Sequence, residues 1–251
     1  MNENVKEKII VALDVSTGQE AKSVISELKG EVGAFKIGLQ LFTACGANLV
    51  REIVDGGTKI FLDVKLHDIP VTVAKASVEV ARLGVWMFNI HASGGREMIE
   101  RTVDLVSETC EREKLLKPKI IGVTVLTSSD KETLEETGIG KSVEDQVLSL
   151  ARLSHNCGLD GVVASPNEVG LISRDIGGDD FLIVTPGVRL GEVENDDQKR
   201  VMTPGEAVSE GSDYLVIGRP ILDAEDPRQR VSAIIENIER ISSRSRSTIN
   251  S

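Results

Sequence analysis

Short apolar segments and longer amphipathic segments alternate along almost all of the 251 residues. Eight of the short segments have the length and the β-branched or apolar content of buried strands. They are Ile9–Asp14, Ala34–Ile37, Ile60–Leu66, Met87–His91, Ile120–Leu126, Gly161–Ala164, Phe181–Thr185 and Tyr214–Ile217. Their spacing leaves room for a helix after each strand, as parallel βα units require. The chain is therefore predicted to fold as a closed (β/α)8 TIM barrel.

The segments between these strands carry helix signals. Helical periodicity is clear in Ala21–Leu28, Val71–Leu83, Met98–Leu116, Val143–His155 and Val231–Ile241. Thr17, Ser165 and Thr203 each precede a Glu by three residues, which is capping-box spacing, and Pro follows the last two at the first helical position. An open, doubly wound sheet is the alternative architecture. The absence of a GxGxxG motif after the first strand favours the barrel.

No domain boundary is apparent, so residues 1–251 are expected to form one domain with short flexible tails at about 1–7 and 242–251. Two polar segments within it are expected to be irregular. Ser128–Lys141 follows the fifth strand, and Val188–Val201 follows the seventh. Because long polar loops are uncommon in compact domains, the second is either functional or disordered.

Charge and composition exclude several classes of function. A net charge of −11 and the lack of a basic stripe argue against a nucleic-acid partner. No segment approaches the ~20 apolar residues of a membrane span, and the charged N-terminus does not resemble a signal peptide. Cys45, Cys110 and Cys157 have no metal-binding spacing and are expected to be reduced thiols. A cytoplasmic protein is predicted.

The third predicted strand, Ile60–Leu66, ends in charge. Asp63 and Lys65 are two residues apart, so in a regular strand both side chains point to the same face. Asp68 follows, just before the expected start of a helix at Pro70. A surface ion pair beside a capping Asp is the alternative interpretation, and would contribute little stability. Because the strand is otherwise apolar, a catalytic or binding role is favoured.

In a barrel, the C-terminal ends of the strands meet at one mouth, where active sites lie. This rule gathers polar residues from seven strand ends. They are Asp14, Lys36, Asp63, Lys65, His91, Thr127, Arg189, Gly218 and Arg219. Gly218 and Arg219 after the eighth strand, with Arg189 after the seventh, fit a phosphate site, although a C-capping Gly beside a surface Arg is the alternative. For His91 a structural, hydrogen-bonded role is favoured over catalysis.

A metal site is conceivable at the same mouth. Asp14, Asp63 and Asp68 could supply oxygen ligands to Mg²⁺. Lys36 and Lys65 lie between these acids and would repel a divalent cation. A site without metal is therefore expected.

The segment from Asp63 to Pro70, DVKLHDIP, resembles the orotidine 5′-phosphate decarboxylase family, whose DxKxxD pattern is matched at Asp63, Lys65 and Asp68. The resemblance covers about Ile9 to Ile235. Further matches are Asp14 in ALD, Lys36 in KIG, Thr127 in LTS, Arg189 in TPGVR, Gln198 in DDQ, and Gly218 with Arg219 in VIGRP. DxKxxD alone also occurs in related sugar-phosphate barrels, but its combination with the later motifs is specific.

The resemblance implies a cofactor-free decarboxylation of orotidine 5′-monophosphate to uridine 5′-monophosphate in de novo pyrimidine biosynthesis. Lys36, Asp63 and Lys65 would form an alternating charge array, and Asp68 would join it from a partner subunit. Lys65 would stabilise the carbanion at C6 and then protonate it. The family resemblance therefore also implies a homodimer.

The same resemblance assigns substrate contacts. Asp14 and Lys36 would meet the ribose hydroxyls, and Thr127 the pyrimidine. Ile69 and Thr72 would, like Asp68, complete the partner's site. The remaining residues would take the phosphate, with the loop Val188–Val201 as a lid. They are Arg189, Gln198, Gly218 and Arg219.

Two other functions remain open. A metal-dependent sugar-phosphate barrel, such as a 3-keto-gulonate 6-phosphate decarboxylase or hexulose-phosphate synthase, shares the acid–Lys–acid strand but needs Mg²⁺. A non-catalytic protein that binds phosphorylated metabolites would explain Gly218 and Arg219. It would not explain the charges packed at Asp63, Lys65 and Asp68. The fold alone does not decide among these functions.

Overall fold

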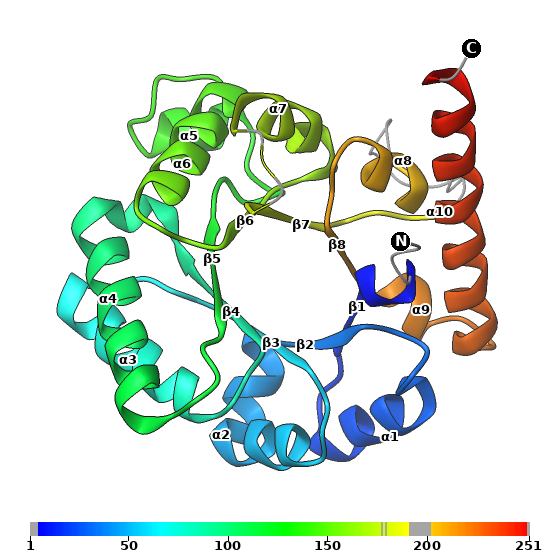
Figure 1. Cartoon of the computed structure of the whole chain (residues 1–251), viewed down its shortest axis with the longest axis horizontal. Coiled ribbons are helices and arrows are strands. Elements are labelled where there is room, and N and C mark those ends of the chain that lie inside the picture. Colours follow the sequence, from blue (N-terminus) through cyan, green and yellow to red (C-terminus); the bar gives the residue numbers. More distant parts are fainter. Residues whose placement is uncertain (1–4, 177, 179, 191–201, 250–251) are drawn as a thin grey trace.

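In the computed structural model, which describes residues 5–176, 178, 180–190 and 202–249, eight parallel strands close into a barrel in sequence order (Figure 1). The strands are β1 (Ile9–Ala12), β2 (Ala34–Gly38), β3 (Ile60–Leu66), β4 (Met87–His91), β5 (Lys119–Val123), β6 (Gly161–Val163), β7 (Leu182–Pro186) and β8 (Tyr214–Ile217). Pairing of β1 with β8 completes the closure. The predicted (β/α)8 barrel is confirmed.

Helices follow the strands and surround the barrel (Figure 1). The α-helices are α1 (Gly18–Leu28), α2 (Leu39–Asp55), α3 (Pro70–Arg82), α4 (Gly95–Glu113), α5 (Lys131–Glu136), α6 (Val143–Asn156), α7 (Pro166–Ile176), α8 (Pro204–Ser209), α9 (Arg219–Leu222) and α10 (Pro227–Ile249). Two 3₁₀ turns, η1 (Val5–Lys8) and η2 (Ala92–Gly94), precede β1 and α4. The helix starts predicted at Thr17 and Thr203 are capping boxes, as expected.

Alternation along the strands separates two layers of core. Ile9 and Val11 point outward, toward the helices, whereas Ile10 and Ala12 point into the barrel. Phe61 of β3 is the largest side chain of the inner layer and is 1% exposed. Because the apolar layer fills the lower part of the barrel, polar side chains above it remain at the mouth.

Register then decides which side chains reach that mouth. Lys36 pairs across to Ala12 on one side and to Phe61 on the other. It follows Ala34 by two residues, so it continues the inward-facing row of β2. Asp63 follows Phe61 in the same way on β3. Both charges therefore lie just above the apolar layer, at the C-terminal ends of their strands.

Several boundaries differ from the predictions. β5 ends at Val123, three residues before the predicted end, because the chain turns away after its last pairing with β6. The helix α2 was not predicted. Gly46, with φ 69°, kinks it and interrupts its periodicity. Within the segment expected to be irregular, Lys131–Glu136 is helical, capped by the Asp130 side chain that accepts from Thr133 N at 2.9 Å.

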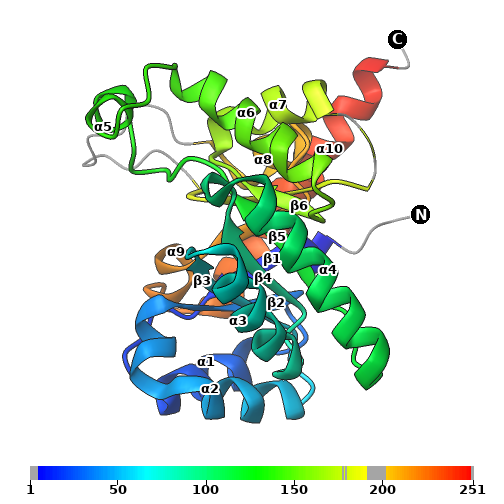
Figure 2. The same cartoon turned by 90° about the vertical axis from the view of Figure 1, so that its left-hand side faces the viewer.

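Helical structure extends into parts of both segments that were expected as tails. The segment from 242 to 249, expected as part of a flexible tail, belongs to α10. Val5–Lys8 forms η1, and Glu7 in it pairs with Lys59 at 3.2 Å. Figure 2 shows the described chain beginning, in blue, on the opposite side of the barrel from α5 and α9, which follow β5 and β8. None of the helices in the described part of the chain is long and apolar enough to cross a bilayer.

Candidate active site

A cavity of about 680 Å³ opens at the C-terminal mouth of the barrel. Eight of the residues predicted to form the site line it. They are Asp14, Lys36, Asp63, Lys65, Thr127, Arg189, Gly218 and Arg219. They come from loops after β1, β5, β7 and β8 and from the strands β2 and β3 themselves. The rule about strand ends thus gathered these residues correctly.

Asp63 is the centre of a charge array in this cavity. Its Oδ1 accepts a hydrogen bond from Lys65 Nζ at 2.5 Å, and its Oδ2 lies 3.3 Å from Lys36 Nζ. Lys36 Nζ also lies 3.7 Å from Asp14 Oδ1. The side chains of Lys36 and Asp63 are 11% and 13% exposed, whereas that of Lys65 is 36% exposed. The array therefore runs from a buried interior to a lysine that solvent and a ligand can reach.

The backbone of β3 is irregular where it carries the array. Leu62 pairs with Phe88 and Leu66 with Ile90, so four steps along β3 match only two along β4. Lys65 has φ 50°, the left-handed region that a non-glycine residue seldom adopts. A bulge of this kind re-aims side chains near active sites. Asp63 and Lys65 do lie together as predicted, but a bulge places them there and not a regular strand.

Asn89 of β4 contacts both members of the pair, and sequence reasoning missed it. Its Oδ1 accepts from the backbone N–H of Lys65 at 2.8 Å, and its Nδ2 donates to Asp63 Oδ1 at 2.7 Å. Asn89 is fully buried. The available signal was a single amide inside the apolar strand Met87–His91, next to a strand that ends in charge.

The electrostatic environment keeps Asp63 ionised. Burial acts to raise its pKa, but the positive charges of Lys36 and Lys65, with the hydrogen bonds from Lys65 and Asn89, outweigh burial and hold the pKa below its usual value. The ionised Asp63 carboxylate in turn attracts the side chains of both Lys36 and Lys65. The site therefore presents fixed cations to the cavity.

Gly218 after β8 leaves room for the side chain of Asp14. A Cβ at this position would lie 2.6 Å from Asp14 Oδ2 and 3.2 Å from the Cβ of Ala12. The glycine thus lets the Asp14 carboxylate sit close to the chain at the rim of the cavity. The sequence had indicated only that Gly218 would let the backbone approach a phosphate; the structure adds its contact with Asp14.

Two arginines line the part of the cavity formed by the loops after β7 and β8. Arg189 lies two residues after Gly187 and lines the cavity. Its backbone N–H donates to Met202 O at 3.3 Å, and this bond connects the start of the predicted lid to the residue that follows the lid. Arg219 is the first residue of α9. The wall between the arginines and Lys65 is mainly apolar and includes Val123, Val163 and Pro186. Gln198, also predicted here, lies outside the described residues.

Three predicted site residues do not line the cavity of this chain. Asp68 is exposed, and its Oδ1 accepts from Ile69 N at 2.6 Å. Ile69 and Thr72 are exposed beside it at the start of α3. Ile69 is 63% exposed, as is Leu39 at the start of α2. Exposed apolar side chains thus lie at the starts of the two helices that follow β2 and β3, and one of them, Ile69, adjoins Asp68 in the sequence.

His91 lies at the end of β4 and is half-buried. Within the described part of the chain, its ring contacts that of His67, with centroids 5.2 Å apart. Burial lowers the pKa of His91, and the nearby His67 and Lys65 lower it further. Among the described residues, this ring contact is the interaction found for the His91 ring, and the predicted hydrogen bond is not seen there.

Among the described residues, no three His, Cys, Asp or Glu side chains come together in a way that could bind a metal ion. Asp14 and Asp63 are the two acids of the array, and Lys36 Nζ lies between them. The lysine occupies the position where a cation shared by these carboxylates would lie.

Comparison with known proteins agrees with this geometry. The family model described as "Orotidine 5′-phosphate decarboxylase / HUMPS family" matches residues 7–234. This chain belongs to that family. The resemblance found in the sequence is confirmed, and with it the prediction of a decarboxylase.

Individual members of the family are similar over nearly the whole chain. The orotidine 5′-phosphate decarboxylase of Syntrophotalea carbinolica is 53% identical over 233 residues, which cover 93% of this chain and 95% of the relative. That of Geobacter sulfurreducens is 52% identical over 94% of this chain and 98% of the relative. The crystal structure of the Lactobacillus acidophilus orotidine 5′-phosphate decarboxylase is similar with a TM-score of 0.80 and 37% identity, covering 92% of this chain and 98% of that one.

Proposed function

We propose that this protein decarboxylates orotidine 5′-monophosphate to uridine 5′-monophosphate in pyrimidine biosynthesis, without a metal or other cofactor. The family and its relatives at about 50% identity support the substrate and the reaction. The observation that carries the mechanism is the position of Lys65 Nζ, 2.5 Å from a buried carboxylate and open to the cavity.

The reaction needs stabilisation of a localised negative charge. The bond between C6 and the carboxylate breaks, CO₂ leaves, and the electron pair stays on C6 in an sp² orbital with no adjacent electron sink. A fixed ammonium beside C6 stabilises this charge as it develops. Lys65 Nζ then transfers a proton to C6, and solvent returns a proton to the lysine. Lys36 and Asp63 keep the ammonium in place.

Like-charge repulsion contributes a second effect in this proposal. A substrate carboxylate near Asp63 would be repelled by it, and two unit charges ~4 Å apart interact by about 4 kcal/mol at an effective dielectric constant of ~20. Preorganised electrostatics of the two lysines is the larger and better-supported source of catalysis. Asp63 therefore acts chiefly by orienting Lys36 and Lys65.

The rest of the cavity would bind the nucleotide. Asp14 and Lys36 would contact ribose hydroxyls, Thr127 the pyrimidine, and Arg189 with Gln198 and Arg219 the phosphate, which Gly218 lets the chain approach. Arginine suits phosphate because its planar fork can donate two hydrogen bonds at once. Closure of Val188–Val201 over the phosphate would use remote binding energy to favour the reacting geometry. A substrate without phosphate should accordingly lose kcat as well as affinity.

The test of the cofactor-free mechanism is the loss of orotidine 5′-monophosphate absorbance in excess EDTA, measured for wild type and for Lys65→Ala. Rapid loss with wild type and at least a ~1000-fold lower rate with the variant is expected, because the variant lacks both the fixed charge and the proton donor. Activity that disappears in EDTA and returns with Mg²⁺ would contradict the cofactor-free mechanism. No loss of absorbance by folded protein even with added Mg²⁺ would favour the sugar-phosphate barrels of the same family.

We also propose a cytoplasmic homodimer in which Asp68, Ile69 and Thr72 complete the site of the neighbouring subunit. Support comes from the exposure of the apolar residues Leu39 and Ile69 at the starts of α2 and α3, and from the position of Asp68 outside its own cavity. Mixing Lys65→Ala with Asp68→Ala subunits should restore activity, since one site of each mixed dimer keeps both native residues. Confirmed mixing without recovery would contradict the shared site.

A further inference from the structure

The bulge in β3 is held by one amide side chain. Asn89 lies on β4 between Phe88 and Ile90, which pair with the two ends of the bulge, Leu62 and Leu66. It therefore stands opposite three residues of β3, Asp63, Val64 and Lys65, two more than a regular pairing would give. Asn89 is 0% exposed, and it is a polar residue between two apolar neighbours in the strand. A buried amide at this position is costly unless each of its polar groups is paired.

Both polar ends of the amide are paired, and the partners determine its orientation. Lys65 offers a backbone N–H, which only the oxygen of Asn89 can accept, at 2.8 Å. Asp63 offers an ionised carboxylate, to which only the nitrogen can donate, at 2.7 Å. Swapping the oxygen and nitrogen would break both bonds at once. The amide thus connects the backbone of one array residue to the side chain of the other.

Each bond supports a feature that is unfavourable by itself. Lys65 has φ 50°, and a straight-chain residue in the left-handed region persists only where its surroundings fix it. Asp63 Oδ1 accepts from Lys65 Nζ as well as from Asn89, so its two lone pairs are directed by two donors. The carboxylate plane and the start of the Lys65 side chain are consequently fixed together.

We propose that Asn89 is a positioning residue, which sets the place of the Lys65 ammonium relative to Asp63 through the β3 bulge. This inference rests on the proposed role of Lys65 as the group that stabilises and protonates C6. Asn89 itself does not line the described cavity and is not assigned a contact with substrate. Its effect is on geometry, and a displacement of about 1 Å at a reacting group can cost on the order of 100-fold in rate.

Two substitutions separate the functions of the amide. Asn89→Leu has similar volume and removes both hydrogen bonds. Asn89→Asp keeps the shape and an oxygen acceptor for Lys65 N–H, but replaces the donor with a second carboxylate facing Asp63. Two carboxylates this close repel each other, so the pKa of one of them is raised. That carboxylate therefore binds a proton at a higher pH than an isolated one would. A protonated Asp at this position would again donate to Asp63.

The expected kinetics follow from these changes. Asn89→Leu should lower kcat about 100-fold at every pH while changing KM less than about 3-fold, because the phosphate-binding arginines are untouched. The kcat of Asn89→Asp should be reduced by a similar factor relative to wild type at pH 8. This factor should become at least about 5-fold smaller as the pH is lowered to 5.5. The other charged or titratable groups around the pair are Lys36 on β2, Lys65 and His67 after the bulge, and His91 on β4. Wild type contains the same groups, so the effect of their titration on kcat cancels in the ratio of variant kcat to wild-type kcat.

Asp160 offers a matched control at the other end of the barrel. Its carboxylate accepts from the backbone N–H of Ile120, the second residue of β5, at 2.7 Å, which is also a side chain holding a strand amide. Asp160→Leu should lower the melting temperature in the same way as Asn89→Leu, but leave kcat within about 2-fold of wild type.

The decisive measurement is kcat and KM of the three variants between pH 5.5 and 8, with melting temperatures and circular dichroism to establish folding. A kcat of folded Asn89→Leu within 3-fold of wild type would overturn the proposal, as would a pH-independent deficit in Asn89→Asp. Should Asn89→Leu not fold, the Asn89→Asp pH ratio decides alone. Normal activity of Lys65→Ala would instead overturn the proposed role of Lys65, so the two failures are distinguishable.

Discussion

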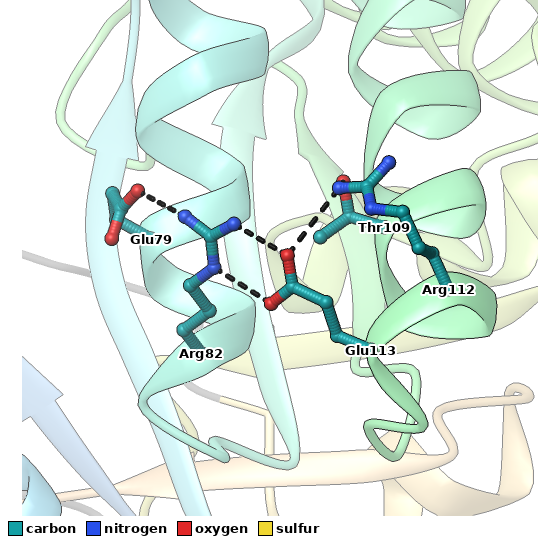
Figure 3. A network of polar contacts seen from close by, with 5 residues as sticks. All are labelled: Glu79, Arg82, Thr109, Arg112 and Glu113. Carbon is teal, nitrogen blue, oxygen red and sulfur yellow. Dashed lines mark hydrogen bonds and ion pairs between the residues drawn. The ribbon is translucent and has the colours of Figure 1, made fainter.

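Two charged networks in this molecule use similar side chains for different ends. One is the array in the barrel mouth, where Lys36 and Lys65 contact the same carboxylate, Asp63. The other joins α3 to α4 on the outside of the barrel (Figure 3). There Arg82 donates from Nε and Nη2 to the two oxygens of Glu113, at 2.9 and 2.6 Å, and from Nη1 to Glu79 at 2.6 Å.

The two networks differ in whether they can take part in proton transfer. Arg82 forms a two-pronged bond with Glu113, and the hydrogen bond it donates holds the pKa of that acid at about 2. Its guanidinium does not give up a proton in proteins, so the network can hold two helices but cannot do acid–base chemistry. Lys65 is a compact ammonium that can be deprotonated, and it is held by a buried acid beside a cavity. Proton transfer requires the second arrangement.

Among the changes that compare the two networks, the largest effect is expected from the central acid of the array. Asp63→Asn removes the charge that both lysines contact and should lower kcat on the order of 100- to 1000-fold, because Lys36 and Lys65 then repel each other and lose their orientation. Steady-state kinetics at neutral pH provide the measurement. An Asp63→Asn enzyme as active as wild type would show that the array is as dispensable as the outer network.

A smaller effect is expected at the rim of the array. Gly218→Ala places a methyl group against Asp14 Oδ2, which can rotate away because the side chain is 53% exposed. Rotation would weaken the contact between Asp14 and Lys36, so kcat/KM should fall about 10-fold with little change in stability. Asp14→Asn serves as the matched variant. If Gly218→Ala is fully active, the close approach of Gly218 to Asp14 has no catalytic consequence.

The outer network should affect stability and not catalysis. Arg82→Ala removes two hydrogen bonds that join α3 to Glu113 of α4 and one to Glu79 within α3, yet the pairs lie at the surface, where such bonds contribute little. We expect kcat and KM within about 2-fold of wild type and a melting temperature lower by only about 1–2 °C. A large loss of activity would mean that this network is coupled to the barrel mouth.

The smallest effect is a change in acid sensitivity. Because the pKa of Glu113 is lowered from 4.5 to about 2, its ion pair contributes stability that is complete above pH 4.5 and is lost as the pH falls toward 2. Glu113→Gln should therefore melt closer to wild type at pH 3 than at pH 7. Thermal melts at both values check this. A difference in melting temperature between the two proteins that stays constant or increases at pH 3 would contradict this prediction.

Much of the fold was predictable because each barrel element carries its own local signal. The eight strands, the start of β3 and the capping boxes at Thr17 and Thr203 depend on nearby residues only. The helix α2 was missed because Gly46 breaks its periodicity. The extension of α10 to Ile249 was missed because its Ser- and Arg-rich end has no apolar face.

The site was predictable where function leaves charges at strand ends, as at Asp63 and Lys65. The bulge that joins them was not, because it depends on how β3 and β4 pair, and pairing is a property of two distant segments. Asn89 was missed for the same reason: its role is visible only once its partners in β3 are known. The positions of Asp68, Ile69 and Thr72 in a second subunit remain predictions.

The central claim, that Lys65 stabilises and protonates the C6 carbanion, can be tested on the product alone. Proton transfer at C6 is reversible in principle, so the enzyme in D₂O should exchange the C6 hydrogen of uridine 5′-monophosphate for deuterium, which proton NMR follows directly. The account predicts measurable exchange with wild type and none above background with folded Lys65→Ala. Equal exchange rates in both proteins would contradict it, because another group would then be delivering the proton.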